Sequence, residues 1–145
     1  MPIMGLNFDK ILVEKKKPLK PPVNVKSDLK VTEVTEADMD APKGLMILRF
    51  NFAFQVDYIP DFAVIELNGH VLYSEEKKKA SEILKSWKKN KKVLDRDLIG
   101  NVMNAALLRS NIKALLLSQE VGLPPHIQMP LLKPKSKTIP SAYTG

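Results

Sequence analysis

Residues 45–58 read LMILRFNFAFQVDY, and this stretch decides the fold. Its apolar side chains fall at every second position, namely Met46, Leu48, Phe50, Phe52, Phe54, Val56 and Tyr58. The positions between them include Arg49, Asn51, Gln55 and Asp57. Alternation with a period of two is typical of a strand with one buried and one wetter face, as in antiparallel sheets. The stretch therefore predicts a long antiparallel strand.

Three further strands are predicted around it, over residues 6–13, 23–31 and 62–73. The connections are short, which favours antiparallel neighbours. Asn68-Gly69 leaves two interpretations of the last segment open. The pair is a strong signal for a two-residue hairpin, but a single long strand with a glycine bulge is the alternative. We favour the bulge, because two very short strands would fit poorly beside a fourteen-residue neighbour.

The periodicity changes to helical after Ser74, which can cap a short helix ending near residues 89–92. Ala80, Ile83, Leu84 and Trp87 form its apolar stripe. A second, longer helix is predicted from Asp95 or Asp97 to about Val121. It would stop at Gly122, with Pro124 and Pro125 beyond it.

The long helix carries two apolar arcs instead of one. The first consists of Ile99, Met103, Ala106, Leu107, Ala114 and Leu117, and the second of Leu98, Ala105, Leu108, Ile112, Leu115 and Leu116. A helix on one side of a sheet needs only one apolar face. We therefore predict a partner subunit on the second arc, with an interface formed by Leu98, Ala105, Leu108, Ile112 and Leu115. The alternative is that the shorter helix packs there.

These elements predict one α+β domain over residues 1–132, with a four-stranded, meander-like antiparallel sheet and both helices on one face. Residues 133–145 are expected to form a flexible, basic tail. The chain of 145 residues has no cysteine and no apolar run of membrane-spanning length. A cytoplasmic location is therefore the expectation.

Few residues in the chain have the types and spacing that catalysis needs. The only histidines, His70 and His126, have no spaced partner, and no glycine-rich phosphate loop or nucleophile elbow is present. Pairs of acidic residues lie in loops or at helix starts, where capping explains them. The sequence predicts a protein that is not an enzyme and has no catalytic residues, no metal site and no cofactor.

The positive charge suggests an alternative function. The formal net charge is +7, and residues 77–92 combine many lysines with Trp87. Cations interleaved with an aromatic ring can bind phosphates and stack bases, so nucleic-acid binding is the alternative. Trp87 belongs to the apolar stripe of its helix, however, and a solvated lysine face explains the charge more simply.

Three stretches resemble the SecB protein-export chaperones. Residues 29–73 resemble that family's central strands, Arg109-Ser110-Asn111-Ile112 is similar to an Arg-x-x-Ile step in its main helix, and residues 122–129 (GLPPHIQM) are similar to its Gly-x-x-Pro-x-apolar-x-apolar ending. The resemblance implies a homo-tetramer or homo-dimer that holds unfolded polypeptides in apolar grooves without ATP. Related members serve toxin–antitoxin systems instead of export. Family members are typically acidic and dock the motor SecA through acidic sheet residues, whereas this chain is basic.

A client-binding groove is predicted where helix cover over the aromatic strands should thin. Tyr58 lies near the turn and Phe62 opens the next strand. Leu123 and Met129, in the proline-bounded segment after the long helix, would form the other wall. Irregular backbone and a flexible methionine suit varied side chains.

Overall fold

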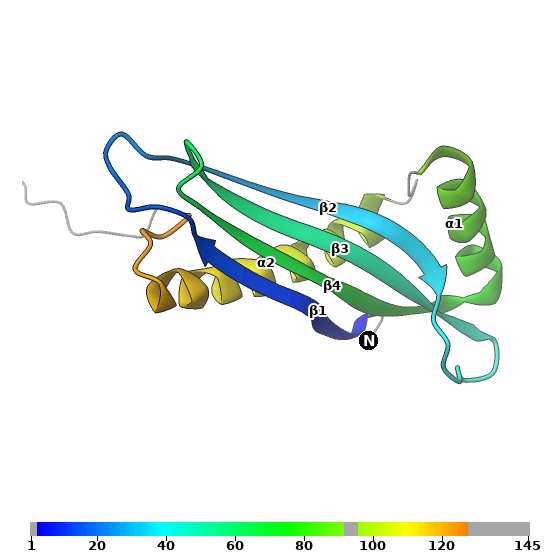
Figure 1. Cartoon of the computed structure of the whole chain (residues 1–145). Coiled ribbons are helices and arrows are strands. Elements are labelled where there is room, and N and C mark those ends of the chain that lie inside the picture. Colours follow the sequence, from blue (N-terminus) through cyan, green and yellow to red (C-terminus); the bar gives the residue numbers. More distant parts are fainter. Residues whose placement is uncertain (1–2, 92–95, 128–145) are drawn as a thin grey trace, which may run out of the picture.

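The structure is a computed structural model that describes residues 3–91 and 96–127. The predicted tail and Met129 lie outside these residues. The described elements are, in chain order, β1 (Ile3–Lys15), β2 (Asn24–Glu36), β3 (Leu45–Ile59), β4 (Ala63–Glu76), α1 (Lys77–Asn90) and α2 (Arg96–Glu120). The α+β prediction, four antiparallel strands followed by a short and a long helix, is confirmed (Figure 1).

The four strands form one antiparallel sheet in the order β1-β4-β3-β2. β2, β3 and β4 make the expected meander. β1 does not pair with β2, its neighbour in sequence, but returns along β4, which produces a Greek-key order. β1 and β2 are therefore the two edges of the sheet, and residues 16–23 connect them around one end (Figure 1).

The alternation in β3 separates the two faces of the sheet as predicted. One face holds fully or almost fully buried side chains, namely Leu48, Phe50, Phe52, Phe54, Val56 and Tyr58. Burying each large apolar side chain contributes roughly 1.5–3 kcal/mol before entropy is counted. Polar side chains such as Arg49 and Gln55 lie on the opposite face, which remains partly in solvent. The aromatic face of β3 is thus the centre of the core.

β4 is one continuous strand, so the hairpin interpretation of Asn68-Gly69 is wrong. The bulge lies across from it, in β1. Phe8 pairs with Gly69 and Lys10 pairs with Asn68, which leaves Asp9 without a partner in the ladder. A Cβ atom at Gly69 would clash with the Asn7 carbonyl oxygen and lie 2.8 Å from Phe52 Cζ. Glycine is required here because the Phe52 ring covers the strand.

Both helices cover the aromatic face. One buried cluster joins Phe50 and Phe52 with Trp87 of α1 and Val102 of α2. α1 begins at Lys77, later than expected, because Ser74 is paired with Ile47 in the strand ladder and does not cap the helix. In the described parts of the chain α1 contacts the sheet and not α2, so the alternative that α1 covers the second arc of α2 is wrong.

α2 buries every fourth residue, namely Leu98, Val102, Ala106, Ser110, Ala114 and Ser118. Four residues advance a helix by about 400°, so the buried face winds slowly round α2 as the helix crosses the twisted sheet. Neither predicted arc alone faces the core for this reason. Most of the buried side chains are small, since large aromatic rings already fill the space above β3. No helix of the described residues is long and apolar enough to cross a membrane.

The close packing at Gly69 gives a prediction. Gly69→Ala should lower the free energy of unfolding by about 1–3 kcal/mol, because the Phe52 ring and the β1 backbone must both shift. Gly100→Ala is the matched control, since its Cβ would meet nothing within 4 Å. That change should stabilise α2 by about 0.5–1 kcal/mol. Urea unfolding of both variants measures the difference, and equal effects would contradict the close packing.

Candidate functional site

The outward face of α2 is the most apolar exposed surface of the described residues. Leu108, Ile112 and Leu116 have 63%, 49% and 54% of their surface exposed. They recur every fourth residue and therefore form one stripe along the helix. Large apolar side chains aligned in this way on a surface usually mark a contact with another molecule.

The predicted interface residues divide between this stripe and the core. Leu108 and Ile112 are exposed, and Ala105 and Leu115 are half-buried. Leu98 is 2% exposed and belongs to the core cluster, so its placement on an outward face is wrong. The buried face winds round α2, and near the start of the helix it includes the position of Leu98. Whether the remaining residues contact a partner subunit stays a prediction.

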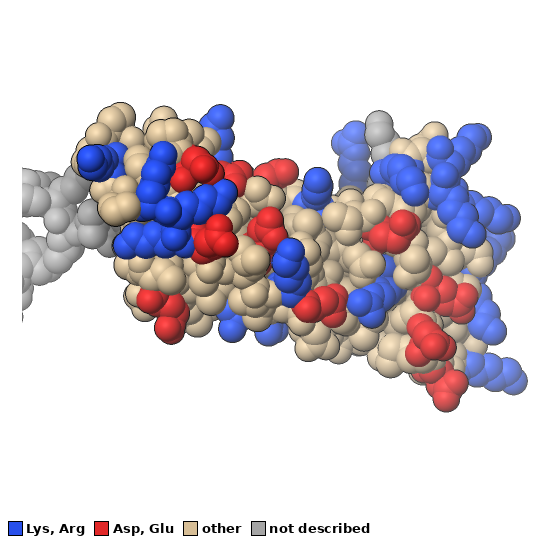
Figure 2. Space-filling view, viewed as in Figure 1, with Lys and Arg blue, Asp and Glu red and all other residues tan. Residues whose placement is uncertain are grey.

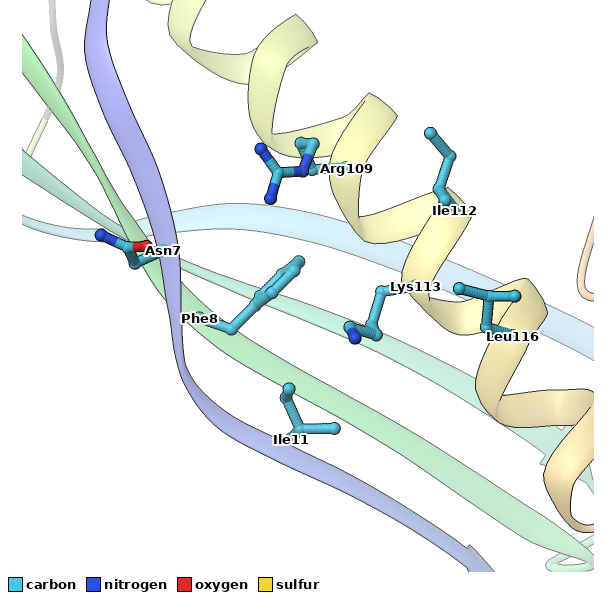
Figure 3. A pocket seen from close by; sticks show the side chains of 7 residues that line it. All are labelled: Asn7, Phe8, Ile11, Arg109, Ile112, Lys113 and Leu116. Carbon is cyan, nitrogen blue, oxygen red and sulfur yellow. The ribbon is translucent and has the colours of Figure 1, made fainter.

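A cleft of about 380 Å³ lies between β1 and α2 and adjoins the exposed stripe. Phe8 and Ile11 line the β1 side, while Arg109, Ile112, Lys113 and Leu116 line the α2 side, with Asn7 at one end. Figure 3 shows Arg109 and Lys113 reaching from α2 into the space in front of β1. The cleft therefore combines apolar walls with two cationic groups, and its volume is in the range of ligand sites.

Neither cation in the cleft has an acidic partner among the described residues. Ion pairs among the described residues include Lys10–Glu66, Lys16–Asp61, Arg49–Asp9, His70–Asp9 and Lys79–Glu75, and none of these pairs involves Arg109 or Lys113. Residues three or four positions away from Arg109 and Lys113 on α2 are apolar, small or cationic. Positive charge in the cleft is thus uncompensated by this part of the chain.

The predicted client-binding residues Tyr58, Phe62 and Leu123 do lie together, but within the core. Tyr58 is 0% exposed, and Phe62 and Leu123 belong to the same buried cluster. The expectation that cover thins over Tyr58 is wrong, because the segment after α2 folds back over it. The Tyr58 hydroxyl donates a hydrogen bond to the Pro124 carbonyl oxygen, and burial raises the pKa of Tyr58 to about 12.

His126 hydrogen-bonds to α2 and so holds residues 122–127, the segment after α2, against that helix. Its Nε2 lies 2.7 Å from Asn111 Oδ1, and since that amide oxygen accepts, Nε2 carries the hydrogen. The ring packs edge-on against Phe54 at 5.9 Å between centroids. Nδ1 is buried without a partner among the described residues. Burial disfavours the charged form and lowers the pKa of His126 below 6.5.

The other histidine belongs to the bulge of β1. Asp9 Oδ2 lies 2.9 Å from His70 Nδ1 and 3.3 Å from Arg49 Nη2. Arg49 Nε also donates to Asn51 Oδ1 at 2.8 Å. These contacts hold the bulged Asp9 on the face without helices, where acidic and basic side chains are interspersed (Figure 2). No group of three potential metal ligands occurs in residues 3–91 and 96–127.

The sequence interpretation missed the cleft because its walls come from opposite ends of the chain. Arg109 and Lys113 belong to neither predicted apolar arc of the long helix, and the pattern of the helix alone assigns them no partner. Phe8 and Ile11 reach them because β1 pairs with β4 under α2, and the sequence pattern does not specify this pairing. The one available signal was two cations a helical turn apart with no acidic residue at helical spacing.

Comparison with known proteins supports the fold. No protein-family model matches the chain, and neither does any curated protein. Among solved structures, the chain is similar to the Mycobacterium tuberculosis Rv1957 SecB-like chaperone, determined in complex with a ChAD peptide from the Rv1956 HigA1 antitoxin. The TM-score is 0.53 with 13% sequence identity, over 92% of this chain and 91% of the other. The chain has a SecB-like fold.

The lowered pKa of His126 predicts a pH dependence of stability. The folded state favours the neutral ring, so its contribution is fully present above pH 6.5 and is lost as pH falls from 6.5 towards the folded pKa. His126→Gln keeps an amide donor but does not titrate. The stability advantage of the wild type over this variant should therefore shrink on acidification, as measured by urea unfolding. All other ionisable groups are common to the two proteins, so an unchanged difference would contradict the assignment.

Proposed function

We propose that the protein is a SecB-like holdase, which binds unfolded polypeptides, including preproteins, without ATP and is not an enzyme. The observation that carries the proposal is the exposed apolar stripe of α2 together with the cleft beside it. A holdase needs apolar surface that folding leaves uncovered, and enough charge to remain in solution. The fold, and the peptide bound to its structural relative, support the same proposal.

First contact with a client is assigned to the cleft and not to the buried aromatic cluster. Phe8, Ile11 and Leu116 are partly or largely exposed and adjacent, so an apolar segment can reach them without any change of fold. Client binding at Tyr58, Phe62, Leu123 and Met129 stays a prediction. It requires residues 122–127 to move away from β3, because Leu123 and His126 are buried there.

Self-association through the outward face of α2 is the second part of the proposal. Leu108 points away from the sheet and leaves most of its surface in water, which is unfavourable for a lone chain. Pairing of two copies through Ala105, Leu108, Ile112 and Leu115 would bury the first part of this stripe and give a homo-dimer or homo-tetramer. Ile112 also lines the cleft, so the interface would adjoin the cleft at this residue, while Leu116 and the other lining residues are not among the interface residues.

Nucleic-acid binding remains the competing function, and it rests on charge alone. Lysine and arginine side chains gather over α1 and near the β1–β2 connection (Figure 2). Trp87 is 6% exposed, and its Nε1 donates to Glu33 Oε1 at 2.7 Å, so no indole face is offered to a base. The lysines of α1 are therefore better explained as a solvated surface of the helix. A cytoplasmic location is a further part of the proposal.

The holdase proposal predicts that the wild type suppresses aggregation of an unfolded model protein at both low and high salt. Apolar capture is not weakened by salt, whereas phosphate contacts lose affinity steeply. Ile11→Ser should reduce suppression several-fold with little effect on thermal stability, because Ile11 is 48% exposed. Met39→Ser is the control, since Met39 is equally exposed in a distant loop. Tight binding of single-stranded nucleic acid without any effect on aggregation would overturn the proposal.

A separate experiment tests self-association. Leu108→Glu places a charge in the centre of the proposed interface and should convert an oligomer into monomers. Met39→Glu adds the same charge to another exposed apolar position and should leave the oligomer intact. Light scattering at micromolar concentration distinguishes these outcomes. A monomeric wild type under the same conditions would contradict the proposed interface.

A further inference from the structure

We infer that the cleft between β1 and α2 selects extended polypeptide segments in which acidic and apolar residues alternate. The inference rests on the proposed function, and it adds a client class that a purely apolar groove would not favour. It is based on the charges of the α2 wall, the spacing of those charges and the apolar character of the β1 wall.

The charges of the α2 wall are available to an external anion. Arg109 and Lys113 lie one helical turn apart, and like charges at this spacing disfavour a helix by about 0.2–0.5 kcal/mol. No acidic residue of the described chain forms an ion pair with either of them. Both reach into the cleft beside the apolar Ile112 and Leu116. A ligand with two carboxylates facing α2 would relieve the repulsion between these two cations.

The spacing of the cations matches an extended chain. Four residues of helix rise about 6 Å, which is the separation of Arg109 and Lys113 along the axis of α2. Alternate residues of an extended segment lie about 6.6 Å apart and project to the same side. Acidic residues at positions i and i+2 of a bound segment can therefore face the two cations together. Adjacent acidic residues project to opposite sides and cannot.

The β1 wall suits the remaining side chains of such a segment. Phe8 and Ile11 face α2 across the cleft (Figure 3). In an extended ligand the residues between the acidic positions point towards this wall, where apolar side chains are preferred. The wall from Asn7 to Ile11 is about 13 Å long, so roughly four residues of the ligand fit. The preferred ligand thus has the pattern acidic-apolar-acidic-apolar.

Charge also disfavours two occupants that this chain could supply, its C-terminal residues and a second copy docked symmetrically at the cleft. Residues 128–145 contain Lys133, Lys135 and Lys137 and no aspartate or glutamate. Two copies related by a two-fold axis at the cleft would bring identical Arg109 and Lys113 pairs together. The acidic segment is therefore assigned to a client polypeptide, and not to the C-terminal residues or to a second copy docked symmetrically at the cleft.

The test uses three labelled peptides with the same apolar residues: one with Glu at positions i and i+2, one with Gln there, and one with two adjacent Glu. Fluorescence anisotropy with the full chain should give about tenfold tighter binding of the first peptide at low salt, because two charge-assisted hydrogen bonds form. The preference should shrink at high salt, since the cleft is open to solvent. Equal binding of all three by the wild type would overturn the inference.

Variants locate the selectivity. The double variant Arg109→Gln with Lys113→Gln should bring the three affinities within about twofold of each other. The control is Lys85→Gln with Lys89→Gln, which removes two cations at the same spacing on the exposed side of α1. This control should keep the tenfold preference. Arg109→Glu with Lys113→Glu should prefer a peptide with Lys at the two positions. Selectivity that survives loss of Arg109 and Lys113 would overturn the inference but leave the holdase proposal intact. Failure to bind any peptide, together with failure to suppress aggregation, would overturn both.

Discussion

The rings of Phe50, Phe52, Phe54 and Tyr58 on one face of β3 determine what can pack above them. Side chains of this size fill most of the layer between a sheet and a helix, so the helix contributes little volume of its own. This accounts for the small residues on the inner face of α2 between Ala106 and Ser118, and for Gly69 beneath Phe52. The core is thus supplied mainly by one strand.

The same constraint moves the large side chains of α2 away from the core. Leucines and isoleucines that would normally face a sheet lie on the flank and outer side of the helix, where Leu108, Ile112 and Leu116 are exposed. A helix with a small inner face also lies close to the sheet, which brings its flank near the edge strand β1. The proposed client-binding surface is therefore a consequence of the aromatic core, because that core leaves α2 apolar on more than one side.

The fold was largely predictable from sequence because periodicity encodes which residues face a core. The strand over Leu45–Tyr58, the helix stop at Gly122 and the α+β class all follow from local patterns. The position of β1 does not, since pairing between strands distant in sequence leaves no periodic signal. The site was predictable only in part. Tyr58 was predicted to line a groove but is buried, because residues 122–126 fold back over it. Two hydrogen bonds hold that segment, one from Tyr58 to the Pro124 carbonyl oxygen and one from His126 to Asn111, and no periodic pattern in the sequence indicates them.

The pairing of β1 with β4 also orders events during synthesis. β1 leaves the ribosome before the other described elements, but its partner strand β4 begins only at Ala63, whereas β1 ends at Lys15, and α2 follows later still. Closing so large a loop is slow relative to forming the β2–β3–β4 meander, so β1 docks late. The cleft has one wall from each of these late elements and exists only after both are in place. A nascent chain consequently cannot occupy the proposed binding site before its own sheet is complete, and a client bound there would stabilise the docked edge strand against fraying.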